Sequence, residues 1–294
     1  MSEQSNTAVI QPRKRNSQLK DIWRRFSRSR TAMLGLIIII ILIITAIFAD
    51  VIAPEGFDDQ HYDRTFIFPN SNNIMGTDNL GRDIFSRIVY GARISLRVGF
   101  TAVSISLITG TCLGSIAGFY GGVLDNVIMR SVDILLAIPS TLLAIAIASA
   151  LGPGITNVMI AVGIGTVPTY ARIVRASVLT LRDQEFIEAA RSVGASDFRL
   201  IFKHILPNCM APIIVQTTLG LANAILSAAA LSFIGLGIAP PTPEWGAMLT
   251  VGRRYIRDFW PGVVFPTLAI AVVVFALNML GDGLRDAFDP KLKK

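Results

Sequence analysis

Residues that could support catalysis are few in this chain of 294 residues. His61 and His204 are the two histidines, and both lie outside the long apolar runs, which argues against an intramembrane enzyme. Cys112 and Cys209 stand far apart, with neither metal-ligand spacing nor a disulfide framework. The sequence has no G-x-x-x-x-G-K-[ST] loop to cradle nucleotide phosphates. We therefore expect no catalytic, cofactor or metal site in this chain, and energy for any work must come from another chain.

Acidic residues near the apolar runs raise the alternative of an ion-coupled secondary transporter. Such carriers need ionisable side chains near the middle of the bilayer, where each one is costly and therefore functional. Here Asp133 and Asp282 stand at the ends of apolar runs, each three residues from an arginine, Arg130 or Arg285. We expect two i, i+3 pairs at the membrane surface rather than a proton path. The spacing disfavours the secondary transporter.

One segment indicates recognition of a protein partner instead of catalysis, and it spans Leu181–Asn208. Phe186, Ala190 and Val193 recur at i, i+4 and i+7 among charged residues, a pattern that predicts an amphipathic helix. Gly194 then supplies the left-handed conformation that commonly ends a helix.

A second helix is predicted to follow in the same segment. Ser196 is a suitable N-cap, Pro207 closes the helix, and the apolar positions between them repeat at i, i+3, i+4 and i+7: Phe198, Ile201, Phe202 and Ile205. The hairpin could lie in the membrane interface, but the acids of its first helix suit a protein partner better than anionic lipid. Because Ala189 and Ala190 offer a small flat face, we interpret the hairpin as a docking knob for a soluble subunit.

The residues of this hairpin resemble a known signature. Glu188-Ala189-Ala190, then Gly194, then Leu206-Pro207 is similar to the EAA motif in permeases of binding-protein-dependent ABC importers. In that family the motif's short helix is the coupling helix, inserted in a cleft of the ATPase subunit. The one departure is His204, where the family often has Ile. The resemblance implies an ATPase-coupling role for eight residues: Glu185, Phe186, Glu188, Ala189, Ala190, Gly194, Leu206 and Pro207.

Other segments resemble one branch of that family, the permeases for dipeptides, oligopeptides and nickel. Met75-Gly76-Thr77-Asp78 and Tyr90-Gly91-Ala92-Arg93 are similar to their outer segment. Leu231–Gly237 and the ending Gly281–Asp286 are similar as well, and the long N-terminus resembles that of the second (C-type) permease of such systems. Ala228 stands where relatives often carry Glu.

The elements that position these residues follow from composition. With 52% hydrophobic and 16% charged residues, the chain has apolar runs of about 20 residues, enough to cross a bilayer. The sequence predicts an all-α, polytopic bundle of six spans, and the resemblance implies the type I ABC importer permease fold. The spans are Thr31–Ala49, one within Val98–Leu124, two within Ile134–Ala171 separated by Gly152-Pro153-Gly154, Ala211–Ile234 and Phe259–Leu280. Gly110, Gly114 and Gly118 allow a close helix contact, either within the chain or with another subunit.

Basic residues predict the orientation. Most of the 27 Lys and Arg residues fall before Thr31, between the fourth and fifth spans, or after the sixth, which places both termini in the cytoplasm of a bacterial or archaeal cell membrane. The net charge of +7 is thereby explained without a nucleic-acid partner. We divide the chain into a cytoplasmic segment 1–30, a permease domain 31–284 with a coupling loop 175–207, and a cytoplasmic tail 285–294. Arg82, Arg87, Arg93 and Arg97 are the exceptions, in a long outer segment.

The resemblance implies a function and its partners. The chain would form the translocation path for peptides with a second permease, energised by two ATPase subunits that bind ATP and Mg²⁺. A substrate-binding protein outside the membrane would deliver the substrate. Nickel or an oligosaccharide remains an alternative substrate.

Overall fold

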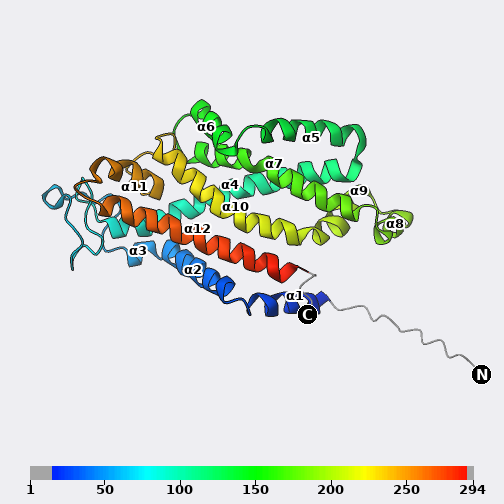
Figure 1. Cartoon of the computed structure of the whole chain (residues 1–294), viewed down its shortest axis with the longest axis horizontal. Coiled ribbons are helices and arrows are strands. Elements are labelled where there is room, and N and C mark those ends of the chain that lie inside the picture. Colours follow the sequence, from blue (N-terminus) through cyan, green and yellow to red (C-terminus); the bar gives the residue numbers. More distant parts are fainter. Residues whose placement is uncertain (1–14, 290–294) are drawn as a thin grey trace, which may run out of the picture.

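The computed structural model describes residues 15–289, with side chains from Lys20 onward, and these residues form a bundle of helices (Figure 1). The end residues 1–14 and 290–294, with the basic residues Arg13, Lys14, Lys291, Lys293 and Lys294, lie outside the described residues. The helices are α1 (Arg15–Phe26), α2 (Arg30–Ile47), α3 (Ala49–Ile52), η1 (Tyr62–Arg64), α4 (Ile84–Tyr120), α5 (Gly122–Leu136), α6 (Ser140–Leu151), α7 (Ile155–Leu181), α8 (Glu185–Ser192), α9 (Asp197–Arg199), η2 (Leu200–Ile205), η3 (Leu206–Asn208), α10 (Met210–Phe233), α11 (Trp245–Gly252), η4 (Arg253–Tyr255) and α12 (Pro261–Phe288).

Within residues 15–289, five helices are long and apolar enough to cross a membrane: α2, α4, α7, α10 and α12. The remaining predicted span, the third along the chain, corresponds to the pair α5 and α6, which is bent by 89°. The predicted span from Ile134 is interrupted near its beginning, where α5 ends at Leu136 and α6 begins at Ser140, because Pro139 lies at the break and has no backbone N–H to continue the helix. The predicted turn after this span is confirmed, with Gly152 and Gly154 at φ +82° and +147°.

Helices α4 and α7 pack at backbone distance along the stripe of Gly110, Gly114 and Gly118. A Cβ at Gly114 would lie 2.4 Å from the carbonyl oxygen of Ala171, and one at Gly110 would lie 2.4 Å from the Cβ of Tyr170. Of the two roles that the sequence left open for this stripe, the structure therefore shows packing within the chain.

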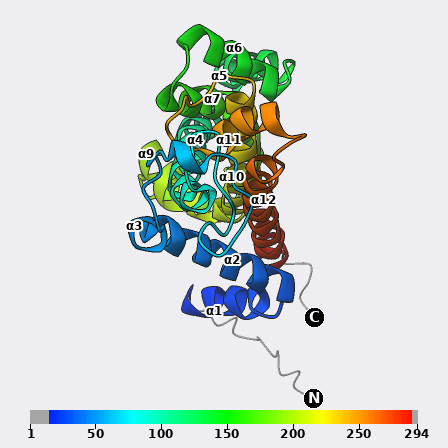
Figure 2. The same ribbon diagram turned by 90° about the vertical axis from the view of Figure 1, so that its left-hand side faces the viewer.

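The bundle is layered across its long axis. In Figure 2, α5 and α6 lie at one side and α1 and α2 at the other, with α4, α7, α10 and α12 between them. Helix α2 is held by α12 through small residues, since a Cβ at Gly35 would lie 2.7 Å from the carbonyl oxygen of Ala276. The other face of α2 is a row of half-exposed Leu and Ile side chains. An apolar row of this kind, with no protein cover, is typical of a surface that faces lipid.

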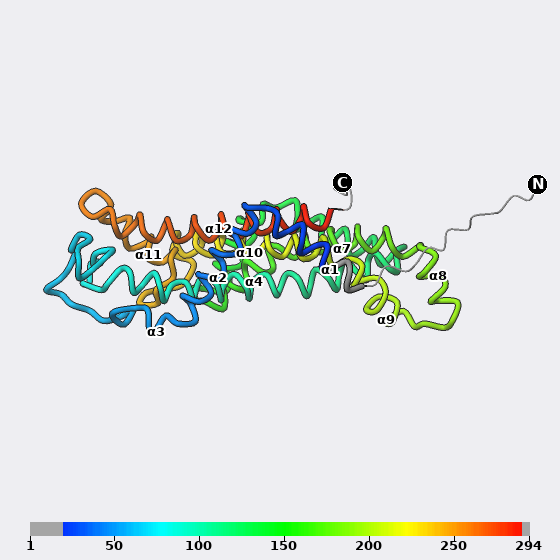
Figure 3. The backbone as a smooth tube through the Cα atoms, turned by 90° about the horizontal axis from the view of Figure 1, so that it is seen from below, coloured from blue at the N-terminus to red at the C-terminus, as the bar shows by residue number. Residues whose placement is uncertain are grey.

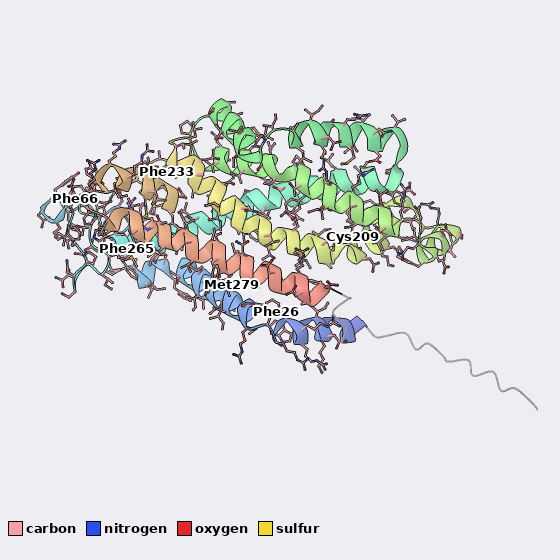
Figure 4. All side chains as sticks on the ribbon, in the orientation of Figure 1. Phe26, Phe66, Cys209, Phe233, Phe265 and Met279 are labelled. Atoms are coloured by element: carbon pink, nitrogen blue, oxygen red, sulfur yellow. The ribbon has the colours of Figure 1, made fainter. Side chains whose placement is uncertain are left out.

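Residues 53–83, α11 and the beginning of α12 gather at one end of the bundle, opposite α8 (Figures 1 and 3). An apolar cluster joins Phe66, Trp245, Met248 and Phe259, and Figure 4 places Phe66 at this end. The irregular chain thus forms a packed cap, which we call the outer cap (residues 53–83 with α11).

The outer cap explains three of the four arginines that departed from the charge rule, while the fourth, Arg97, is exposed on α4. Arg82 is 2% exposed, and its Nε lies 2.8 Å from Oδ2 of Asp78. Arg87 is 4% exposed and donates to the carbonyl oxygen of Phe57 at 2.7 Å. Arg93, on α4 beside the cap, pairs with Asp50 at 3.0 Å. These cations are paired within the protein, which compensates for their burial.

The predicted acid pairs are not formed as expected. Asp133 pairs with Arg172 of α7, at 2.7 Å, rather than with Arg130. Asp282 is exposed and, among the described residues, makes no ion pair with Arg285. For Asp133, a contact between two helices therefore replaces the predicted i, i+3 contact along one helix.

Candidate coupling hairpin

Residues 182–209 project from the end of the bundle opposite the outer cap, and we call them the coupling hairpin (Figure 1). Helix α8 begins at Glu185 and ends at Ser192, close to the prediction. Both acids of its first turn, Glu185 and Glu188, interact favourably with the positive end of the helix dipole.

Gly194 ends α8 as predicted, with φ +85°. The N–H of Gly194 donates to the carbonyl of Arg191 at 2.9 Å, and the N–H of Ala195 donates to that of Ala190 at 3.1 Å. This is a Schellman motif, which satisfies two carbonyls that the helix leaves free. No atom lies within 4 Å of a Cβ built at Gly194, so only the backbone conformation demands glycine there.

Ile187 is the residue that anchors α8, and the sequence analysis missed it. Its side chain is fully buried in a cluster with Val174, Val178, Leu200 and Ile205. Phe186 and Val193, which were predicted on the buried face, are 41% and 86% exposed. The predicted amphipathic helix is therefore present, but rotated so that these two apolar side chains face outward.

The second helix of the hairpin is composite. A short α-helical turn, α9, runs into the π-helical η2 and the 3-10 turn η3 before α10 begins. Ser196 occupies the N-cap position, but its side chain makes no capping bond, contrary to the prediction. Ile201 and Ile205 are buried as predicted, whereas Phe198 and Phe202 are 71% and 56% exposed, with ring centroids 4.4 Å apart.

The eight predicted coupling residues divide by exposure. Ala190 and Leu206 are half-buried against the cluster around Ile187, so they position the hairpin. The remaining residues are exposed: Glu185, Phe186, Glu188, Ala189, Gly194 and Pro207. Among the described residues the carboxylates of Glu185 and Glu188 make no hydrogen bond or ion pair. The exposed face of α8 thus combines two unpaired acids with apolar side chains, as suits a protein partner.

Polar contacts fix the hairpin to the bundle. Arg182 donates to the carbonyl oxygen of Gly118 at 3.0 Å, and the guanidinium of Arg191 lies 5.7 Å from the ring centroid of Phe119. Cys209, buried where the hairpin joins α10, belongs to the same apolar cluster (Figure 4). Cys209 is thus a packing residue, whereas Cys112 is exposed on α4.

The helix that leads into the hairpin is itself braced by charge. Arg175 of α7 makes two hydrogen bonds of 2.6 Å to the carboxylate of Asp125 on α5. Together with the Arg172–Asp133 pair, this contact fastens α5 to α7. Through the cluster around Ile187 and these two ion pairs, α8 is thus connected to α7 and α7 to α5.

An apolar groove of about 760 Å³ runs beside the hairpin. It is lined from α4 by Ile108, Cys112 and Ser115, and from the hairpin and α10 by Phe202 and Met210. The hydroxyl of Ser115 is buried and has no hydrogen-bond partner within the described part of the chain. This face of α4 and α10 is left uncovered by the chain's own helices.

Comparison with known proteins agrees with this architecture. A solved methionine ABC transporter, in an inward-facing conformation, matches with a TM-score of 0.56 over 70% of this chain and 98% of that one, at 18% identity. An amino acid ABC transporter matches with a TM-score of 0.52 over 71% of this chain, also at 18% identity. The likeness defines the class of protein: the chain has the fold of a type I ABC importer permease.

Sequence comparison identifies the family within this class. Residues 110–294 match the family described as binding-protein-dependent transport system inner membrane component, and residues 17–71 match the N-terminal TM domain of oligopeptide transport permease C. This protein belongs to that family of inner membrane components and is a multi-pass membrane protein.

Three similar relatives are transport permeases. The dipeptide transport system permease protein DppC of Alkalihalophilus pseudofirmus is 50% identical over 94% of this chain and 91% of its own length. The di/tripeptide transport system permease protein DppC of Pseudomonas aeruginosa is 47% identical over 98% of this chain and 96% of its own. The glutathione transport system permease protein GsiD of Escherichia coli is 48% identical over 97% of this chain and 94% of its own.

Proposed function

We propose that this permease subunit forms, with a second and related permease chain, a translocation path for dipeptides and other short peptides. The observation that carries the substrate class is the identity of 47–50%, over at least 94% of the chain, to permeases named for dipeptides, di/tripeptides and glutathione. The groove on α4 and α10 supports a second permease, because a concave apolar surface of this size can receive side chains of another chain. A substrate-binding protein delivers the peptide at the outer cap.

Two ATPase subunits supply the energy and bind the ATP and Mg²⁺, and one of them receives α8. The unpaired Glu188 carboxylate can accept charge-assisted hydrogen bonds from this ATPase. Exposed Phe186 and Val193 add apolar contact area. Since Ile187 fixes α8 to the ends of α7 and η2, closure of the ATPases moves these elements together.

The hairpin and both chain ends belong to the cytoplasmic side in this proposal. Helix α1 packs against the last turns of α12, and both lie toward the same end of the bundle as the hairpin (Figure 1). The basic residues of the hairpin and of α1 agree with this orientation.

Glu188→Lys tests the coupling role. The variant reverses the charge at an exposed position, so the permease is expected to reach the membrane in normal amount. Co-purification of the ATPase subunits and peptide uptake are both expected to fall at least tenfold. Asp286→Lys, the same charge change at an exposed site on the last turns of α12, serves as the matched control. Wild-type ATPase association and uptake in Glu188→Lys would overturn the assignment of α8.

A pair of changes at Gly194 separates hairpin shape from charge. Gly194→Ala meets no steric contact, but forces a Cβ into a left-handed conformation at a cost of about 1 kcal/mol. Gly194→Asn is expected to be milder, because Asn tolerates that conformation better. Equal ATPase association for the two variants would argue against a role of the Schellman turn.

A further inference from the structure

Helix α1 has two faces of different chemistry. Phe26 is 4% exposed and, with Ile22, packs against α12 beside Ala287. The opposite side of the helix carries exposed Lys20, Trp23 and Arg24, and exposed Arg28 follows in the turn after α1. We call these four residues the basic stripe.

The cations of the basic stripe are not used within the protein. Asp21 is the one acid between residues 20 and 30, and it is not on the exposed side. Among the described residues, Lys20, Arg24 and Arg28 make no ion pair. Arg25, on the side toward α12, differs in that it donates to the backbone oxygen of Asp289 at 3.3 Å. The stripe therefore presents three unpaired positive charges, with complementarity for an anion-rich surface.

The position of the stripe indicates which surface that is. The exposed row of α2, which includes Leu34, Ile37 and Ile41, begins directly after α1 and is the face assigned above to lipid. Trp23 is 57% exposed, and an indole ring is favoured at the level of the headgroups. Figures 1 and 3 both show that α8 reaches further along the bundle than α1. The stripe thus lies nearer the bilayer than the coupling hairpin does.

We propose that the basic stripe of α1 binds the headgroups of anionic phospholipids in the leaflet bordering the cytoplasm. The choice of leaflet rests on the orientation proposed above, whereas the lipid class rests on the charge of the stripe. Each Lys or Arg near such a surface contributes attraction equivalent to about a fivefold change in affinity, which salt weakens. The stripe adds lipid selectivity to a chain that its spans already anchor.

The experiment uses the assembled transporter in lipid nanodiscs and follows quenching of tryptophan fluorescence by brominated lipids. Trp23 is isolated by subtracting the signal of Trp23→Phe, because Trp245 and Trp260 also emit. Brominated phosphatidylglycerol is titrated against brominated phosphatidylcholine at low and high salt. We expect the Trp23 signal to be quenched at lower fractions of phosphatidylglycerol, and this preference to shrink at high salt.

Variants identify the cations responsible. Replacing the three cations of the stripe, as Lys20→Gln, Arg24→Gln and Arg28→Gln together, is expected to reduce the preference for phosphatidylglycerol by about fivefold per cation. A matched triple change at the other end of the bundle removes the same charge and is expected to keep the preference: Arg253→Gln, Arg254→Gln and Arg257→Gln.

Two outcomes would overturn the proposal. One is an unchanged preference in the stripe variant. The other is a double result, in which neither lipid quenches Trp23 and the stripe variant loses its ATPase subunits. That result would assign the stripe to a protein partner. Neither outcome depends on which substrate is transported, so failure here leaves the proposed peptide transport untouched.

Discussion

Glu244 caps α11 from inside the outer cap. It is 2% exposed, and its carboxylate accepts hydrogen bonds from the N–H groups of Gly246 at 2.9 Å and Ala247 at 2.8 Å. Burial raises the pKa of Glu244 although these two hydrogen bonds oppose the shift. The folded protein therefore holds the proton of Glu244 more tightly than the unfolded chain does.

The sign of this shift predicts how stability depends on pH. The contribution of Glu244 is fully present below its unfolded pKa and is lost as the pH rises through the raised folded pKa. We expect Glu244→Gln to remove that loss, so that the wild-type Tm minus the variant Tm decreases from acidic to neutral pH. Thermal unfolding in detergent measures it, with the exposed Glu185→Gln as control. A constant Tm difference would contradict the assignment.

Individual residues also show what the sequence could specify. The role of Gly194 was predictable, because the left-handed residue that follows an amphipathic helix is usually glycine. Ile187 was not, because apolar residues adjacent in sequence compete for one buried position, and an eight-residue helix offers too few turns to decide between Phe186 and Ile187. The Asp133–Arg172 pair joins two helices, so no local spacing could reveal it.

Among the elements, η2 accounts for the largest difference in the hairpin. A π-helical ladder of i→i+5 bonds has more residues per turn than an α-helix, so the side chains that follow are rotated from their α-helical positions. Phe202, inside η2, therefore does not join Ile201 and Ile205 in the core, and Phe198, which precedes η2, is exposed as well. The apolar period of the sequence predicted that a helix exists, but not its local winding.

The contact between α4 and α7 gives a prediction at the same scale. Gly114→Leu would drive a side chain against the backbone of Ala171, so we expect the helices to separate, with a loss of stability of at least about 1–3 kcal/mol. The measurements are Tm and the amount of folded protein in the membrane. Thr109→Leu, on an exposed face of α4, is the control and is expected to be tolerated. Similar Tm values for the two variants would argue against this contact.

For the whole molecule, the lengths of the apolar runs predicted the number of spans well. Five spans and a bent additional one agree with the prediction, and three of the four arginines that departed from the charge rule, Arg82, Arg87 and Arg93, are paired in or beside a packed cap. The bend at Pro139 was missed. The absence of charged residues indicates that a segment is apolar, but it does not indicate where the helix axis changes direction.

The proposed orientation predicts labelling from outside the cell. Single cysteines at Ser27 and Asp286, in a chain lacking Cys112 and Cys209, are expected to resist a membrane-impermeant maleimide in intact cells. A cysteine at Asn72, exposed in the outer cap, is expected to react. All three should react after the membrane is opened. Labelling of either end position in intact cells would contradict the orientation.

The pairing of α2 with α12 has a consequence for biosynthesis. The first span, Arg30–Ile47, leaves the ribosome long before Pro261–Phe288, the helix on which it packs. At elongation rates of about 5–20 residues per second, the intervening chain takes on the order of 10 s or more to make. During that time α2 must persist in the bilayer without its partner, which its mean hydropathy of 2.6 permits. Folding of this chain is therefore completed by a contact between its two ends, when α12, the last span to be made, packs against α2, the first.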